Sequence, residues 1–381
     1  MEQSYKIIIA GDLIPSGKNI KLFEEGDAEE IFSKEVVAIF QNADFSVVNL
    51  EGALTDSVVA KQKVGPNIKA PLKSIEGIRN LGVKAVALAN NHITDYGNIG
   101  YADTINAFEQ AGIIHFGSGS SKTNVKTHIS VECGERKICI YNVSETFFNV
   151  PDNANAGVNI YDEWLVLNEI KQLKTNHDYI IVMYHGGAEH FLYPTPQTRK
   201  RFHRMAECGA DIVISQHTHC IGCEEFYKDS YLLYGQGNFS FARQKESITR
   251  EGLILEIVFD KTVSIKKHRI EMLDSDCLKY SDNQDFNDLF KRSEQIYDEG
   301  FIISQYRKID LAQNRFANRY LYSYRGISGI LMRKILPTKI WNKWIKSYTA
   351  KQVLCNLYAA ESDRVREDLI QCWYALDEKI I

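Results

Sequence analysis

The stretch VISQHTHCIGC, residues 213–223, joins an apolar run rich in β-branched side chains to two histidines and two cysteines. The run predicts a buried strand that leads directly into His217 and His219. In an extended strand, residues two apart point to the same face, so this spacing favours a shared metal site. A structural zinc site on Cys220 and Cys223 would need two further ligands at suitable spacing, and the sequence offers no matching pair. We therefore interpret the histidines as the ligands and the cysteines as ordinary reduced thiols.

Apolar runs of this kind alternate with amphipathic segments along the chain. Six runs have the composition of strands: 5–11, 45–52, 85–92, 137–143, 178–187 and 211–219. Five segments with apolar residues at helical spacing separate them: 29–42, 71–82, 100–112, 161–176 and 195–209. This alternation predicts a layered α/β domain. Two later runs, 251–259 and 262–273, predict an antiparallel second sheet.

Polar side chains follow nearly all of the predicted strands. They are Asp12, Asn49, Glu51, Asn90, Asn91, His92, His185, His217 and His219. A single such residue is ordinary at a strand end, but the carboxyl ends of neighbouring parallel strands share one sheet edge, where ligands bind. We therefore expect these side chains to surround one pocket. Carboxylate, amide and imidazole groups suit one or two divalent ions of manganese, iron or zinc, and a carboxylate can bridge a pair.

The composition is that of a globular protein. The chain has 381 residues, of which 44% are hydrophobic and 25% charged, with a formal net charge of -4. This balance excludes the overall basic character that nucleic-acid binders usually show. The first apolar run is too short for a signal peptide or a membrane span, and the eight cysteines show no dense spacing pattern. We predict a cytoplasmic protein that binds no nucleic acid.

The C-terminal part of the chain has a different composition. We predict a catalytic domain over 1–275 and a mostly helical region over 276–381. Within 311–360 there are nine Lys or Arg residues and no Asp or Glu, together with Trp341 and Trp344. This predicts a helical docking surface for an anionic partner, including peripheral contact with an anionic membrane. The alternative is a helix that packs on the catalytic domain through its indoles.

Six motifs follow one another in a fixed order: IIIAGD, VVNLEGALT, ALANNHITDYG, YHGGAEHFLYPTPQ, GADIVISQHTHCI and YGQGNFSF. This series, over about residues 5–245, resembles the CapA family of capsule and poly-γ-glutamate biosynthesis proteins. That family is similar in turn to the calcineurin-like metallophosphoesterases. The resemblance implies a four-layer α/β/β/α sandwich of the metallophosphoesterase type with a metal site at the strand ends, followed by a C-terminal helical appendage.

The resemblance also implies roles for individual residues. Asp12 and His219 would hold a first metal ion, and Glu51 would bridge to a second. Asn91, His185 and His217 would complete the second position, and His92, beside Asn91, would protonate the leaving group. We assign weak substrate contacts to Asn49, Glu189, His190 and Asn238. For Glu189 and His190, a solvated loop and a substitute metal ligand remain alternatives.

Two departures from the phosphoesterase pattern bear on activity. Ile14 stands where the Asp-x-His pattern has its histidine, so we predict weaker binding at the first metal position. Glu51 stands where the phosphoesterases have an aspartate. We predict a metal-dependent hydrolase of capsule, exopolysaccharide or poly-γ-glutamate biosynthesis that uses a metal-activated water on a phosphoester or amide. The alternative is a non-catalytic accessory protein with a vestigial metal site that binds an anionic polymer or a synthase partner.

Overall fold

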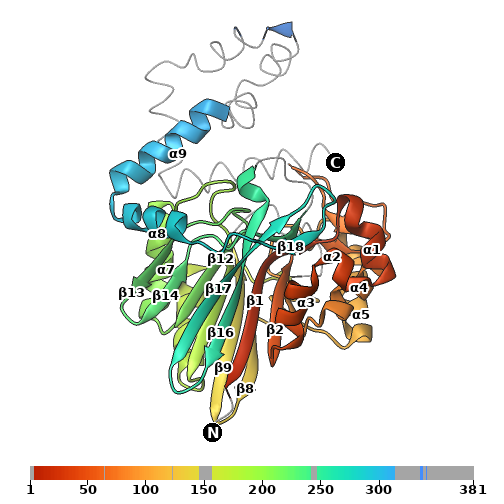
Figure 1. The fold of residues 1–381 in the computed structure, drawn as a ribbon, viewed down its shortest axis with the longest axis horizontal. Helices are drawn as coiled ribbons and strands as arrows, with labels where there is room; N and C mark the ends of the chain where they lie inside the picture. The colour runs from red at the N-terminus through yellow and green to blue at the C-terminus, as the bar shows by residue number, and fades with distance from the viewer. Residues whose placement is uncertain are drawn as a thin grey trace. The chain divides into compact units, whose positions relative to one another are not determined.

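A computed structural model describes most of the chain, shown as a ribbon in Figure 1. The described residues are 4–63, 65–121, 123–145, 157–241, 247–313, 335–337 and 340. The chain divides into two compact units, Met1–Ile303 and Ser304–Ile381. Most of the predicted docking surface, including both tryptophans, lies outside the described residues, so it stays a prediction. None of the described helices combines the length and apolar character that a membrane crossing requires.

An eight-stranded sheet, called here the first sheet, is built around the N-terminal strand. Its strands, in spatial order, are β18 (Leu278–Tyr280), β17 (Val263–Met272), β16 (Glu251–Phe259), β1 (Tyr5–Ile14), β2 (Phe45–Leu50), β5 (Ala85–Ala87) and β6 (Ile114–Phe116), with β15 (Asn238–Phe241) also paired to β1. Strands β1, β2, β5 and β6 are parallel neighbours. The prediction that 251–259 and 262–273 form a second sheet is wrong. They are β16 and β17, and β16 pairs with the first half of β1, whose edge would otherwise lack hydrogen-bond partners there.

A six-stranded sheet, the second sheet, packs against the first. Its strands, in spatial order, are β13 (Glu224–Tyr227), β14 (Ser230–Leu233), β12 (Ile212–Gln216), β11 (Tyr179–His185), β9 (Arg136–Ser144) and β8 (His128–Cys133). The four inner strands are parallel, and the two outer strands are antiparallel to their neighbours. Two short pairs lie outside these sheets: β3 (Ala53–Leu54) with β4 (Lys69–Ala70), and β7 (Ser118–Gly119) with β10 (Gly157–Val158).

Helices cover the outer face of each sheet. The α-helices are α1 (Ile20–Glu25), α2 (Ala28–Ile31), α3 (Lys34–Gln41), α4 (Ile75–Leu81), α5 (Gly97–Ala111), α6 (Glu163–Lys174), α7 (Pro196–Glu207), α8 (Asn287–Ser293) and α9 (Glu299–Gln313). Short 3-10 turns occur at Gly17–Asn19, Leu72–Ser74, Ser247–Thr249 and Glu294–Tyr297. Residues of α1 to α5 pack on the first sheet, and residues of α6 and α7 pack on the second.

Alternation along the strands separates three apolar layers. In β1, Ile8 and Ala10 belong to the core that the first helices cover, whereas Ile7 and Ile9 belong to the core between the sheets. Strand β11 divides in the same way between the inter-sheet core and the core under α6 and α7. Because strand side chains alternate between faces, sheets buried on both sides need apolar residues at every position. The expected four-layer α/β/β/α sandwich is confirmed.

The predicted helix over 29–42 is two helices. Ser33 separates α2 from α3 and has a φ of 44°, a left-handed conformation that a right-handed helix cannot contain. The other four predicted helices correspond to α4, α5, α6 and α7, and all six predicted strands are present. Leu289 of α8 and Ile296 pack into the cores of the sandwich, so residues beyond the predicted boundary at 275 continue the same unit. The domain boundary itself stays a prediction.

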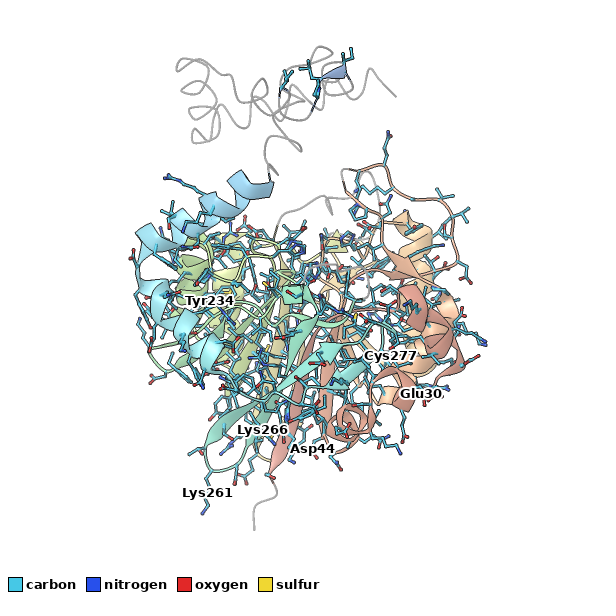
Figure 2. The ribbon with its side chains drawn as sticks, turned by 45° about the horizontal axis from the view of Figure 1, so that its top comes forward. Glu30, Asp44, Tyr234, Lys261, Lys266 and Cys277 are labelled. Atoms are coloured by element: carbon cyan, nitrogen blue, oxygen red, sulfur yellow. The ribbon has the colours of Figure 1, made fainter. Side chains whose placement is uncertain are left out.

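Two buried glutamine side chains tie the sheets together near the carboxyl ends of β1 and β12. Gln216 Nε2 donates to the carbonyl of Ala10 (3.3 Å) and to Gln236 Oε1 (3.0 Å). Gln236 Nε2 donates to the carbonyls of Ile9 (2.7 Å) and Leu253 (3.0 Å). These bonds bring the carboxyl ends of the two sheets together. Figure 2 labels Asp44, which precedes β2, and Lys261, in the β16–β17 turn, at the opposite edge.

Phe239 fixes strand β15 in the fold. It is fully buried and stacks on Phe32 with ring centroids 5.2 Å apart, and it contacts the tilted ring of Phe40 with centroids 5.3 Å apart. Phe239→Ala should therefore lower the free energy of unfolding by about 3–5 kcal/mol, measured by urea denaturation. Phe226→Ala, at a position that is 75% exposed, is the matched control and should change it by no more than about 0.5 kcal/mol. Equal losses for both variants would contradict this account.

Candidate metal centre

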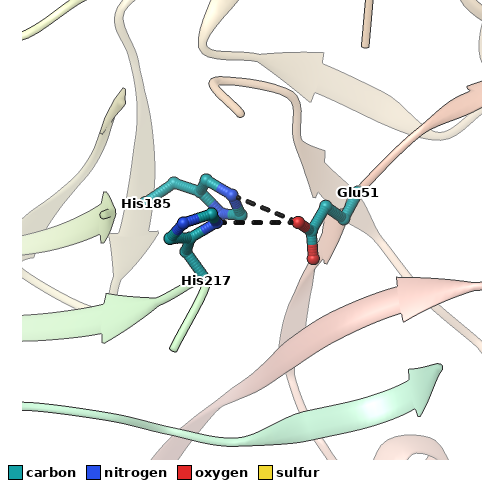
Figure 3. A group of neighbouring side chains, drawn as sticks. All are labelled: Glu51, His185 and His217. Atoms are coloured by element: carbon teal, nitrogen blue, oxygen red, sulfur yellow. Dashed lines mark ion pairs between the residues drawn. The ribbon is translucent and has the colours of Figure 1, made fainter. Parts of the chain in front are cut away.

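Strands of both sheets bring the predicted ligands to one place. Asp12 lies in β1 and Glu51 directly follows β2, whereas His185 ends β11 and His217 and His219 follow β12. All five side chains are buried. Figure 3 shows the Glu51 carboxylate directed toward the imidazoles of His185 and His217. The prediction that these residues share one pocket therefore agrees with the geometry, although two sheets, rather than one sheet edge, supply them.

Glu51 stands between two groups of ligand atoms. Its Oε1 lies 3.5 Å from His185 Nε2, 3.8 Å from His217 Nδ1 and 3.8 Å from His219 Nε2. Asp12 Oδ2 lies 3.4 Å from His219 Nδ1. We call Asp12, Glu51 and His219 the first metal position. Glu51, His185 and His217, with Asn91, form the second metal position. In each group the carboxylate and imidazole ligand atoms lie within 4.8 Å of one another.

The surroundings of Glu51 fit a bound cation. Both carboxylate oxygens are buried, and within the described parts of the chain neither has a hydrogen-bond partner. The imidazole nitrogens near Oε1 are beyond ordinary hydrogen-bond distance, but their spacing is that of atoms that bind a common ion. Leaving a buried carboxylate without donors costs several kcal/mol. A divalent ion at either position would remove that cost.

The loop after β12 holds its histidines by a different geometry from the one we predicted. Strand β12 ends at Gln216, and both His217 (φ 82°) and His219 (φ 56°) have left-handed backbone conformations. The argument that an extended strand places both on one face is therefore wrong. Instead, the backbone N–H of His217 donates to Asp12 Oδ2 at 2.9 Å, which fastens the loop to the first sheet. Such conformations are costly for non-glycine residues and concentrate at functional sites.

A row of buried amides supports the ligands. Asn49 Nδ2 donates to Asp12 Oδ1 at 2.7 Å, and Asn90 Nδ2 donates to the carbonyl of Leu50 at 2.6 Å. Asn91 Oδ1 lies 2.9 Å from His185 Nε2, so the amide we assigned to the second metal position does reach it. Asn49 is fully buried among these groups, and its substrate contact stays a prediction.

His92 forms a dyad with an aspartate. His92 Nδ1 lies 2.6 Å from Asp95 Oδ2, which also accepts a hydrogen bond from the backbone N–H of Ile68 at 2.8 Å. Lys63, buried in the loop before β4, pairs with Asp95 Oδ1 and lies 3.2 Å from His92 Nδ1. The sequence analysis missed both partners. Asp95 could have been found three positions after His92, within ALANNHITDYG, but no local signal marks Lys63.

The remaining predicted residues surround the histidines. Glu189 Oε1 lies 3.8 Å from His217 Nε2, and its side chain is 37% exposed. The His190 ring centroid lies 6.1 Å from that of His219, and Asn238 Oδ1 lies 2.9 Å from His219 Nδ1. All three therefore border the metal positions, and their substrate contacts stay predictions.

Ile14 and the two cysteines take no part in the cluster. Ile14 is fully buried in the core beneath the first helices, so the position of the absent histidine is filled by apolar packing. Cys220 and Cys223 are buried, and their thiols donate to the carbonyls of Phe191 and Leu192.

The ionisable groups of the two positions differ in how tightly they hold protons. Burial and the Glu51 charge raise the pKa of Asp12 to about 7. Burial alone would raise the pKa of Glu51 and lower that of His219. The imidazoles of His219 and His185 instead bring the Glu51 pKa well below its usual value, and the carboxylates of Glu51 and Asp12 raise the pKa of His219. Burial lowers the pKa of His185 to about 4. At neutral pH the imidazole of His185 is therefore neutral and able to bind a metal ion, whereas the carboxyl of Asp12, in the first metal position, is still partly protonated.

Metal binding at the first metal position should therefore weaken in acid. An ion there must displace protons from Asp12 and His219, so its affinity falls as the pH drops below about 7. Calorimetric titration with Mn²⁺ should show two unequal binding events at about pH 8, and the weaker event should disappear by about pH 6. Two ions of equal affinity at both pH values would contradict the assignment.

Comparison with known proteins agrees with the resemblance noted from the motifs. The chain is 26% identical over 242 residues to the capsule biosynthesis protein CapA of Bacillus anthracis, covering 61% of this chain and 59% of that protein. It is 27% identical over 236 residues to the PGA biosynthesis protein CapA of Bacillus subtilis, covering 61% and 62%. The matches thus span about three fifths of these relatives.

A solved structure and a family model complete the comparison. A structure described as a novel phosphatase from Mycoplasma pneumoniae superposes with a TM-score of 0.46 and 16% identity, covering 76% of this chain and 100% of that one. The family model described as bacterial capsule synthesis protein PGA_cap matches residues 6–243. This match covers more than half of the chain and all the ligands described above, so the chain belongs to the PGA_cap family of bacterial capsule synthesis proteins.

Proposed function

We propose that the protein is a metal-dependent hydrolase of capsule, exopolysaccharide or poly-γ-glutamate biosynthesis that cleaves a phosphoester or an amide. The observation that carries the proposal is Glu51, whose carboxylate is buried, has no hydrogen-bond partner among the described residues and is shared by two groups of candidate ligand atoms. A divalent ion bound there would lower the pKa of a water molecule and polarise the bond to be cleaved. Membership of the capsule synthesis family supports the biological setting.

The residues of the chain supply the proton that the leaving group needs. Asp95 accepts from His92 Nδ1, which fixes the tautomer and leaves Nε2 as the other exchangeable position. His92 follows Asn91, whose side chain reaches His185 in the second metal position. Lys63 forms a buried ion pair with Asp95, so its positive charge lies beside the carboxylate that holds His92. In this arrangement His92 acts as the general acid and Asp95 as its positioning residue.

A non-catalytic accessory role is the second candidate, and Ile14 is the observation in its favour. An apolar side chain in the core stands where the first metal position would gain an imidazole. Such a protein would keep the fold and bind an anionic polymer or a synthase partner. The basic segment 311–360, with Trp341 and Trp344, remains the predicted surface for that contact.

Activity measurements on variants distinguish the two candidates. With Mn²⁺, Fe²⁺ or Zn²⁺ present, the protein should hydrolyse bis-p-nitrophenyl phosphate or a γ-glutamyl polymer. His92→Ala should lower kcat by about 10²–10⁴-fold with unchanged metal content, because it removes only the proton donor. His217→Ala should lower both kcat and bound metal, because it removes a ligand.

The control is His177→Ala, because His177 is a buried histidine in the loop between α6 and β11, and its Nε2 lies 2.8 Å from Ser130 Oγ. This variant should retain the activity of the parent protein per folded molecule. Hydrolysis that survives both His92→Ala and His217→Ala would rule out the enzymatic function proposed for this metal centre. Metal binding with no hydrolysis of any substrate tested would favour the accessory role.

A further inference from the structure

Asn238 makes a directional contact with one ligand of the first metal position. It lies in β15, opposite Asp12 of β1 in the parallel register. Its Nδ2 donates to the carbonyl of Thr249 at 2.7 Å, and its Oδ1 lies 2.9 Å from His219 Nδ1. A carbonyl can only accept, so the contact with Thr249 fixes which end of the amide faces the histidine. The end that faces His219 is the oxygen.

This orientation determines the tautomer of His219. An amide oxygen can only accept a hydrogen bond, so the hydrogen of the neutral imidazole must be on Nδ1. The lone pair is then on Nε2, the nitrogen that lies 3.8 Å from Glu51 Oε1. Asn238 is 3% exposed and His219 is 6% exposed, so water has little access to compete for the contact.

The neighbouring histidine presents its other nitrogen to the same carboxylate. His217 directs Nδ1 toward Glu51 Oε1 and Nε2 toward Glu189 Oε1, each at 3.8 Å. The two histidines of the loop therefore need opposite tautomers to bind ions on either side of Glu51. Nothing in the spacing of the two residues sets this difference, so it must come from the groups that contact their outward nitrogens.

We propose that Asn238 is the positioning residue of the first metal position, holding His219 in the Nδ1–H tautomer so that Nε2 can bind the ion. The inference rests on the proposed metal centre. It gives Asn238 a role different from the substrate contact predicted for it, since its amide is engaged on both sides. The role is most important at this position because Ile14 leaves it one ligand short, so the remaining imidazole must be well oriented.

Leucine is a suitable replacement for Asn238 because it has a similar shape and no acceptor. Loss of a group that orients a ligand histidine typically costs about 10–100-fold in metal affinity. Asn238→Leu should therefore weaken the first metal position by about that factor and leave the second unchanged. The matched control is Asn19→Leu, because Asn19 is also fully buried and donates to the carbonyl of Asp276 and accepts from the N–H of Ser16.

Nitrogen-15 NMR of the metal-free, histidine-labelled full chain tests the tautomer directly. Spectra taken at a pH high enough that the His219 signals no longer shift should assign His219 to the Nδ1–H form in the parent protein and in Asn19→Leu. In Asn238→Leu the signal should shift toward the Nε2–H form, the more stable tautomer in water. An Nε2–H form in the parent protein, or no change in Asn238→Leu, would overturn the inference.

Calorimetric titration with Mn²⁺ at about pH 8 tests the consequence for binding. Only Asn238→Leu should lose affinity in the weaker of the two binding events, while Asn19→Leu should bind as the parent does even if it melts at a lower temperature. Equal binding by all three proteins would overturn the inference and leave the metal centre intact. A parent protein that binds no ion would instead overturn the proposed metal centre and the inference with it.

Discussion

The buried carboxylate of Glu51 is the constraint on which the arrangement of the site depends. A charge that is removed from water and has no hydrogen-bond donor must be compensated by nearby positive charge, because the desolvation cost is several kcal/mol. Imidazoles from the second sheet and from the loop after β12 approach it from two sides. The four-layer fold serves this requirement, since it brings the carboxyl ends of two parallel sets of strands face to face.

Uncharged amides hold the ligands without adding charge. Asn142 of the second sheet donates to the carbonyl of Met183 and accepts from the N–H of Ala89, which joins β9 and β11 to the segment carrying Asn91. Gln216 and Gln236 form the corresponding connection on the other side of the site. Asn142 and Gln236 both donate and accept, and Gln216 donates, so these amides satisfy buried backbone groups near the ends of the strands. The ionisable side chains are then not needed for these backbone contacts and remain available for the proposed metal positions and for the pair of His92 and Asp95.

The two proposed metal positions should differ in affinity for two independent reasons. Ile14 packs in the core and supplies no ligand, and burial, together with the nearby charge of Glu51, raises the pKa of Asp12 to about 7. The second metal position has a neutral His185 and the amide of Asn91 already at 2.9 Å from it. Two ions bound in such a site would differ in their affinity and in their rate of exchange with solvent. In the proposed centre, one ion would be firmly bound and the other would respond to pH and to the groups around His219.

The sequence by itself determined the alternation of strands and helices and the polar residues that gather at the strand ends, and the resemblance of its motifs to the CapA family implied the four-layer class. This was possible because continuous apolar runs indicate strands that are buried on both faces, and because polar residues that follow parallel strands lie at the same edge of the sheet. Only the tertiary structure decided that β16 and β17 extend the first sheet. It also decided that His217 and His219 converge through left-handed loop conformations, and that Lys63, Asp95 and Asn238 contact the histidines. These features depend on pairing between distant segments and on the direction of single hydrogen bonds, which local periodicity does not record.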